Sequence, residues 1–162
     1  MVLPAGVKFI SIHPRRGRIR ACASNIMNSE QPTTVAIVNT TPDSVEMLRD
    51  VLTRAGFVVV SCFTHEIRDG VVDFEAFMRQ HRPSVIAYDL APPYEANFRL
   101  FTHVRSMPPA AGCQFVLTSV NPANVVRLVG RDERVYEVVD REEDLMMFVN
   151  AVKEASRARA VR

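Results

Sequence analysis

The sequence contains no tryptophan, only six glycines and only three cysteines among its 162 residues. The glycines form neither a GxGxxG nor a GxxxxGK[ST] pattern, so the usual glycine-rich loops that bind nucleotide phosphates are absent. No GxSxG turn indicates a serine hydrolase. No apolar run approaches the ~20 residues that a helix needs to cross a bilayer. These absences disfavour nucleotide-binding, hydrolase and membrane functions.

The cysteines indicate a reduced compartment. Cys22, Cys62 and Cys113 are odd in number and lack CxxC spacing, which argues against a disulfide framework or a zinc site. The N-terminus also lacks the apolar stretch of a signal peptide. We therefore expect a cytoplasmic protein in which the cysteines are inert thiols.

Residues 1–33 differ in composition from the rest of the chain. They hold five cations and little regular periodicity, which predicts a basic, disordered N-terminal extension. Because the ordered pattern begins just after Met27, translation from that residue is an alternative, and whether residues 1–26 are translated stays open. A nucleic-acid-binding arm and a targeting peptide are further alternatives. The five cations are Lys8, Arg15, Arg16, Arg18 and Arg20.

From residue 34 onward, apolar runs of strand length alternate with amphipathic stretches. Strands are predicted at 34–38, 57–63, 84–88, 114–118 and 135–139. Helices are predicted to follow each strand, the first opening at Pro42, the second at 73–80, the third at 97–106, the fourth from Pro122 to Gly130 and the last after Asp140. Five β–α units in series predict a parallel sheet with helices on both faces.

Local signals define the ends of several of these helices. Asp43 is expected to cap the first helix with Glu46 as its capping-box partner, and Gly56 to end it in a left-handed conformation. Asp140 and Glu143 have the same spacing before the last helix. The segment that contains Asp69 and Gly70 is expected to be a loop.

The predicted fold class is α/β, a flavodoxin-like doubly wound (βα)5 three-layer sandwich with strand order 2-1-3-4-5. The domain is expected to span residues 34–156, with a frayed tail at 157–162. In this topology, polar residues at the carboxyl ends of the strands gather around one crevice. The members of this set are Asn39, Thr40, Thr41, Asp89, Thr118 and Ser119.

Over residues 34–156 the chain resembles the receiver domain of two-component response regulators, of the CheY type. The resemblance rests on the five-unit rhythm, on Thr41-Pro42-Asp43 opening the first helix and on the run LTRAGF at 52–57. Asp89-Leu90 followed by prolines and Leu117-Thr118 ending the fourth strand add to it.

The resemblance implies specific roles for the strand-end residues. Receiver domains hold Mg²⁺ with an acid pair after the first strand, and they also use an acceptor aspartate, a Ser or Thr, and a Lys. Asp89 matches the phosphoacceptor and Thr118 the hydroxyl, whereas Asn39 and Thr40 stand at the acid-pair positions. No lysine stands near positions 138–139. The chain therefore resembles a degenerate, atypical receiver, a pseudo-receiver.

The missing charges bear on chemistry. Mg²⁺ prefers carboxylate and phosphate oxygens, and phosphoryl transfer depends on positioning and electrostatic stabilisation. We therefore expect no catalytic residues, no enzyme activity, no metal site and no cofactor, with Mg²⁺ disfavoured. For Asp89, three roles remain open: metal-dependent phosphorylation, a strand-end acid that accepts backbone N–H bonds, or binding without chemistry.

These points predict a stand-alone atypical receiver-like signalling domain that acts through protein–protein interaction. The expected partner is a signalling kinase or an output protein; nucleic acid is disfavoured and a homodimer stays open. The resemblance places the interaction face around Arg127, Arg131, Arg134 and Tyr136. Two alternatives are a phosphoacceptor of a two-component phosphorelay using Asp89, and a small-molecule-binding flavodoxin-like domain.

Overall fold

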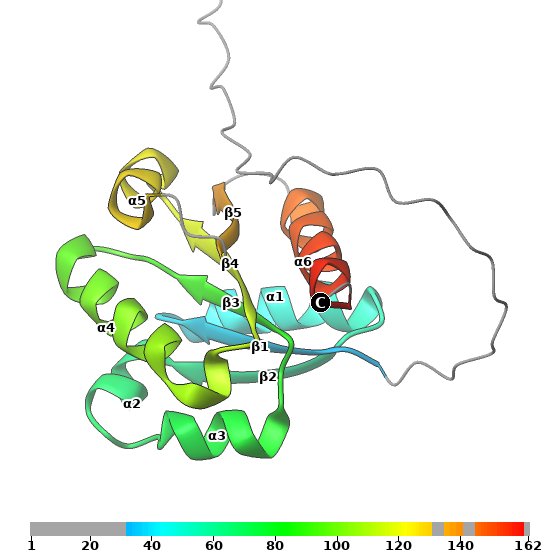
Figure 1. Ribbon diagram of the computed structural model, residues 1–162. Helices are drawn as coiled ribbons and strands as arrows, with labels where there is room; N and C mark the ends of the chain where they lie inside the picture. Colours follow the sequence, from blue (N-terminus) through cyan, green and yellow to red (C-terminus); the bar gives the residue numbers. More distant parts are fainter. Residues whose placement is uncertain (1–31, 131–134, 141–144, 161–162) are drawn as a thin grey trace, which may run out of the picture.

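A central five-stranded sheet lies between two layers of helices in the computed structural model (Figure 1). The structure describes residues 32–130, 135–140 and 145–160; the side chains described are those of 32–130, 135 and 145–158. In chain order the elements are β1 (Thr34–Asn39), α1 (Pro42–Arg54), β2 (Val58–Phe63), α2 (Thr64–Arg68), α3 (Phe74–His81), β3 (Val85–Asp89), α4 (Tyr94–Ser106), the 3₁₀ turn η1 (Pro108–Ala110), β4 (Gln114–Ser119), α5 (Pro122–Val129), β5 (Val135–Asp140) and α6 (Leu145–Ala160).

The sheet has the strand order β2-β1-β3-β4-β5, and every pairing is parallel. The predicted fold class and strand order are therefore confirmed. β1, β3 and β4 are inner strands and are almost entirely buried, which explains why their sequences are nearly continuous apolar runs. The edge strand β2 is more exposed, and Val58 keeps 44% of its surface.

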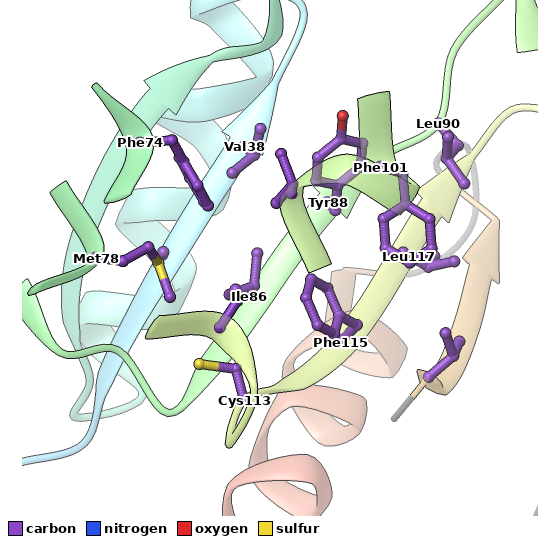
Figure 2. Packing of buried hydrophobic residues seen from close by; sticks show 14 of the residues in the cluster. Val38, Phe74, Met78, Ile86, Tyr88, Leu90, Phe101, Cys113, Phe115 and Leu117 are labelled. Atoms are coloured by element: carbon purple, nitrogen blue, oxygen red, sulfur yellow. The ribbon is translucent and has the colours of Figure 1, made fainter. Parts of the chain in front are cut away.

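Each face of the sheet carries its own apolar core. On one face α1 and α6 pack together and bury Leu52, Val149 and Val152 against β1 and β3. On the other face α3, α4 and α5 cover a cluster with an aromatic centre, where the Phe101 ring lies 5.3 Å from the rings of both Tyr88 and Phe115 (Figure 2). Alternate residues of each strand supply the two cores, as the period of a strand requires.

Several local predictions need correction. Thr41, not Asp43, is the N-cap of α1, because Pro42 occupies the first helical turn and Asp43 lies inside it; no side chain caps the helix. The segment expected to be a loop after β2 begins with the short helix α2, where Glu66 accepts a hydrogen bond from the Phe63 amide at 3.0 Å. Helix α4 begins at Tyr94, three residues earlier than predicted.

Other local predictions are confirmed. Gly56 ends α1 with a φ of 92°, and Gly130 ends α5 with a φ of 64°. Asp73 caps α3 through its side chain, which accepts a hydrogen bond from the Ala76 amide at 3.0 Å. The predicted capping box of Asp140 and Glu143 lies outside the described side chains. Helix α6 continues to Ala160, so the predicted boundary at residue 156 falls within it.

Candidate functional site

The carboxyl ends of the three inner strands bring four predicted site residues together. The sheet register places Asp89 of β3 opposite Thr118 of β4, and it places Asn39 and Thr40 at the end of the neighbouring strand β1. Asn39, Asp89 and Thr118 are almost fully buried, with 1%, 1% and 4% of their surface exposed, and Thr40 is half-buried. We call these four residues the strand-end pocket.

Two hydroxyl groups bind the two carboxylate oxygens of Asp89. Thr40 Oγ1 donates to Asp89 Oδ2 at 3.1 Å, and Thr118 Oγ1 donates to Asp89 Oδ1 at 3.1 Å. Both distances are slightly longer than is usual for hydroxyl donors. Asp89 thereby links β3 to the ends of both neighbouring strands. Hydrogen bonds to a carboxylate stabilise its charged form and offset part of the cost of burying it.

Asn39 has a different role in the pocket from the acid that receiver domains place there. Its side-chain oxygen accepts hydrogen bonds from the amides of Thr40 at 2.7 Å and Thr41 at 3.2 Å. This is an Asx-type turn that directs the chain from β1 into α1. The Asn39 oxygen is therefore occupied by the backbone.

The loop after β3 is tied to the end of β4. The Leu90 amide donates to the Thr118 carbonyl at 2.8 Å, and Ser119 Oγ donates to the Leu90 carbonyl at 2.8 Å. Ser119 Oγ also accepts a hydrogen bond from the Asn121 amide at 3.1 Å, next to the start of α5. These hydrogen bonds connect the end of β4, next to Asp89, to the start of α5.

The donor set does not fit Mg²⁺, which the receiver fold implies. Mg²⁺ requires several hard oxygen ligands in near-octahedral geometry. Here the Asp89 oxygens accept hydrogen bonds from hydroxyl groups, and the Asn39 oxygen accepts hydrogen bonds from backbone amides. Within the described ranges, no three residues among His, Cys, Asp and Glu lie close enough to hold a metal ion.

The cation that the resemblance would place opposite Asp89 has no counterpart at the predicted place. The sequence has two lysines, Lys8 and Lys153. Lys153 lies in the middle of α6, away from the strand ends, and Lys8 lies outside the described residues. Val138 and Val139, where the lysine was sought, pair with Leu117 and Thr118 in the sheet.

The structure describes only part of the predicted interaction face. Arg127 is exposed on α5, and its guanidinium donates to Asn124 Oδ1 at 2.6 Å. Arg131 and Arg134 lie outside the described residues. Tyr136 belongs to β5, but its side chain is also outside the described part. The interaction face therefore stays a prediction.

The hydrogen bonds inside the pocket were not predicted from the sequence. Thr40 was expected only as a replacement for an acid, whereas it is a direct partner of Asp89 across 49 residues of chain. One signal was available for Asn39: an asparagine at a strand end, followed by polar residues and a proline, is typical of an Asx turn.

Comparisons with known proteins agree with this fold. No family model matches the sequence, and no curated protein matches it. Solved structures do: a response regulator from Thermotoga maritima has a TM-score of 0.61 at 15% identity, covering 78% of this chain and 99% of that one. A response regulator receiver protein from Pseudomonas putida has a TM-score of 0.57 at 20% identity, covering 76% and 98%.

A CheY-like response regulator receiver domain from Methylobacillus flagellatus has a TM-score of 0.60 at 15% identity, covering 77% of this chain and 99% of that chain. These identities establish the fold alone. The described part of the chain thus has the fold of response regulator receiver domains. None of its described helices is both long and apolar enough to cross a lipid bilayer.

Proposed function

We propose that this protein is a receiver-like signalling module that acts by contacting a protein partner and does not use Mg²⁺-dependent phosphorylation of Asp89. The observation that carries the proposal is the pair of hydroxyl bonds on the Asp89 carboxylate. In this arrangement, threonines of the chain bind the oxygens that a metal ion or a phosphoryl donor would have to reach. The module is not an enzyme in this proposal.

Electrostatics supports this reading. A phosphoryl group that approaches Asp89 meets a buried negative charge, because Asp89 has 1% of its surface exposed. Phosphoryl transfer commonly uses bound metal ions to offset such repulsion. Thr40 contributes a neutral hydroxyl where a second carboxylate would attract a divalent cation. An oxygen of Asp89 that attacked phosphorus would also lose negative charge, which weakens its hydrogen bond from the threonine hydroxyl.

The pocket can still position a binding surface. Asp89 ties β1 to β4, and the bonds between Leu90, Thr118 and Ser119 continue this link to the start of α5. The predicted interaction face begins on α5 with Arg127. A fixed pocket would hold that face in one arrangement without a phosphoryl signal.

Titration with Mg²⁺ tests the absence of a metal site. We expect no saturable heat of binding for the natural protein in isothermal titration calorimetry at millimolar Mg²⁺. The matched variant Asn39→Asp/Thr40→Asp returns two carboxylates to the end of β1 and removes the Thr40 hydroxyl, so it is expected to gain Mg²⁺ binding. Saturable binding to the natural protein that is lost in Asp89→Asn would contradict the proposal.

The phosphoacceptor alternative has one observation in its favour. The Thr118 hydroxyl lies 3.1 Å from Asp89, as a residue that senses a modified carboxylate would. A phosphorylated Asp89, found in the protein isolated from its native cells and absent in Asp89→Asn, would select this alternative.

A further inference from the structure

Surface charge is distributed unevenly along the described chain. From residue 76 to residue 130 there are five arginines and two carboxylates, and one of those carboxylates, Asp89, is buried. The other is Glu95, which is exposed on α4. Residues 34–75 have the opposite balance, with seven carboxylates and three arginines. Along the chain, an acidic stretch is therefore followed by a basic one.

The basic stretch supplies α4, α5 and most of α3, which lie on one face of the sheet. Helices α3, α4 and α5 form a single layer there, with their buried residues in the same apolar cluster (Figure 1). Arg82 at the end of α3, Arg99 and His103 on α4, and Arg127 on α5 are exposed. We call these four residues the basic face.

Two arginines of the basic face are available for a partner. Arg79, the neighbouring arginine on α3, is paired with Glu75 at 2.5 Å, but within the described residues Arg82 and Arg99 have no ion pair. Arg82 ends α3 with a φ of 47°, a left-handed conformation in which glycine is preferred. An arginine in that place exposes its side chain beyond the last turn of the helix.

Half-buried apolar side chains share helices α4 and α5 with Arg99 and Arg127. Helix α5 buries only Val125 completely, whereas Val126, Leu128 and Val129 are half-buried. On α4, Phe98 and Leu100 are also half-buried. Protein interfaces combine apolar contact with a polar and charged rim, and arginine is enriched in them. The composition of this layer matches that pattern.

We infer that the basic face is a docking surface for an acidic segment of a partner protein, with apolar residues between its carboxylates. The inference rests on the proposed function and names the chemistry of the partner. It also extends the predicted interaction face, which includes Arg127 on α5, to α4 and the end of α3.

A protein segment fits the surface better than nucleic acid does. Residues 1–31 carry five cations and one carboxylate, a net charge of +4. Since the whole chain has a formal net charge of +2, the remaining residues have a net charge of −2. Domains that bind a phosphate backbone are generally strongly basic, because their affinity comes from release of counterions. An overall acidic domain with one basic, partly apolar layer is better suited to a partner that offers a few carboxylates and apolar side chains.

Fluorescence anisotropy with the full-length chain tests this inference. The probes are a labelled peptide that alternates glutamate and leucine, its glutamine analogue, and duplex DNA of similar length. We expect the glutamate peptide to bind more tightly than the other two probes, and more weakly as salt is raised. Arg99→Glu/Arg127→Glu should weaken its binding by about tenfold or more, because two cations that attract the peptide are replaced by carboxylates that repel it.

The matched control is Arg54→Glu/Arg68→Glu, which reverses two exposed arginines that are not members of the basic face. Circular dichroism confirms that each variant is folded. The inference is overturned if the two double variants bind the glutamate peptide equally, if this peptide does not bind, or if DNA binds more tightly. Each of these outcomes leaves the Mg²⁺ titration, and with it the proposed function, to be judged separately.

Discussion

Asp89 and Tyr88 are neighbours on β3, yet they differ in the hydrogen bonding of their polar groups. Both residues are buried, and they point to opposite faces of the sheet. The Asp89 carboxylate accepts hydrogen bonds from two hydroxyl groups. The Tyr88 hydroxyl has no hydrogen-bond partner within the described part of the chain, and it lies in an aromatic cluster beside Phe101 (Figure 2).

The difference shows that hydrogen-bond partners are provided for the buried polar group on one side of β3 and not for the one on the other. A buried polar group without a partner costs about 1–3 kcal/mol, whereas a satisfied one is nearly neutral or stabilising. On the pocket side, Thr40 and Thr118 supply the bonds. On the other side, burial together with nearby Cys62 and Asp89 raises the pKa of Tyr88 above its ordinary value, which keeps the phenol neutral.

Removal of the carboxylate should have the largest effect. We expect Asp89→Ala to lower the free energy of unfolding by about 3 kcal/mol, because two charge-assisted bonds are lost and the buried Thr118 hydroxyl is left unpaired. Urea denaturation measures the change. Asp89→Asn, which keeps one acceptor oxygen, should lose less than half as much. A gain in stability in Asp89→Ala would show that the buried charge is strained and not satisfied.

Substitution by valine removes the hydroxyl of Thr40 or Thr118 and keeps the shape of the side chain. Thr118→Val should cost about 1.5 kcal/mol and Thr40→Val less, since Thr118 is 4% exposed and Thr40 is half-buried. Combining each change with Asp89→Ala in a double-mutant cycle isolates the interaction with the carboxylate. Additive effects in both cycles would mean that the two bonds contribute nothing to stability.

The dependence of stability on alkaline pH tests the burial of Cys62, which lies on β2 in the same apolar cluster as Tyr88. Burial, and to a lesser extent Glu66, raises the pKa of the Cys62 thiol from 9.0 to about 12. The unfolded chain therefore loses this proton first, so the contribution is full below pH 9 and is lost as pH rises toward 12. We expect Cys62 to add a fall of about 1.4 kcal/mol per pH unit within that window.

The readout is urea denaturation at several pH values in the natural protein and in Cys62→Ala. The variant should be less stable at pH 8 because a cavity replaces the thiol, but its stability should decline less steeply between pH 9 and 11. Equal slopes would show that the thiol is not buried in the way described.

Removal of the unpaired phenol should have the smallest effect, and in the stabilising direction. Tyr88→Phe keeps the ring beside Phe101 and deletes the hydroxyl, so we expect a gain of about 1 kcal/mol in thermal or urea unfolding. Tyr94→Phe on α4, where the ring is half-buried, serves as the control and should change stability little. A loss of stability in Tyr88→Phe would reveal a hydrogen bond to the phenol.

The sequence predicted the fold well because its strands are long apolar runs in a regular rhythm. Even the end of α1 followed from one residue, Gly56. The start of α1 at Pro42 was predicted correctly, but its cap was not. Asp43 and Glu46 have the spacing of a capping box, whereas Pro42 in the first turn makes the preceding residue the cap. Helix α2 was missed because it has only 5 residues, too few to show a period.

The pocket was predicted in its members but not in its bonds. Strand ends and topology are enough to bring Asn39, Thr40, Asp89 and Thr118 to one edge of the sheet. Which oxygen accepts from which donor depends on side-chain rotamers and on packing between segments far apart in the chain. Asn39 illustrates the point, since it binds the backbone of Thr40 and Thr41 and does not contact Asp89 through any hydrogen bond described here.

Intact mass spectrometry after incubation with acetyl phosphate and Mg²⁺ tests the central claim most directly. With both Asp89 oxygens bound by threonine hydroxyls, we predict that the natural protein keeps its mass. The Asn39→Asp/Thr40→Asp variant shows under the same conditions whether restored carboxylates bring phosphorylation back. A phosphoryl-sized gain in the natural protein that disappears in Asp89→Asn would contradict the account.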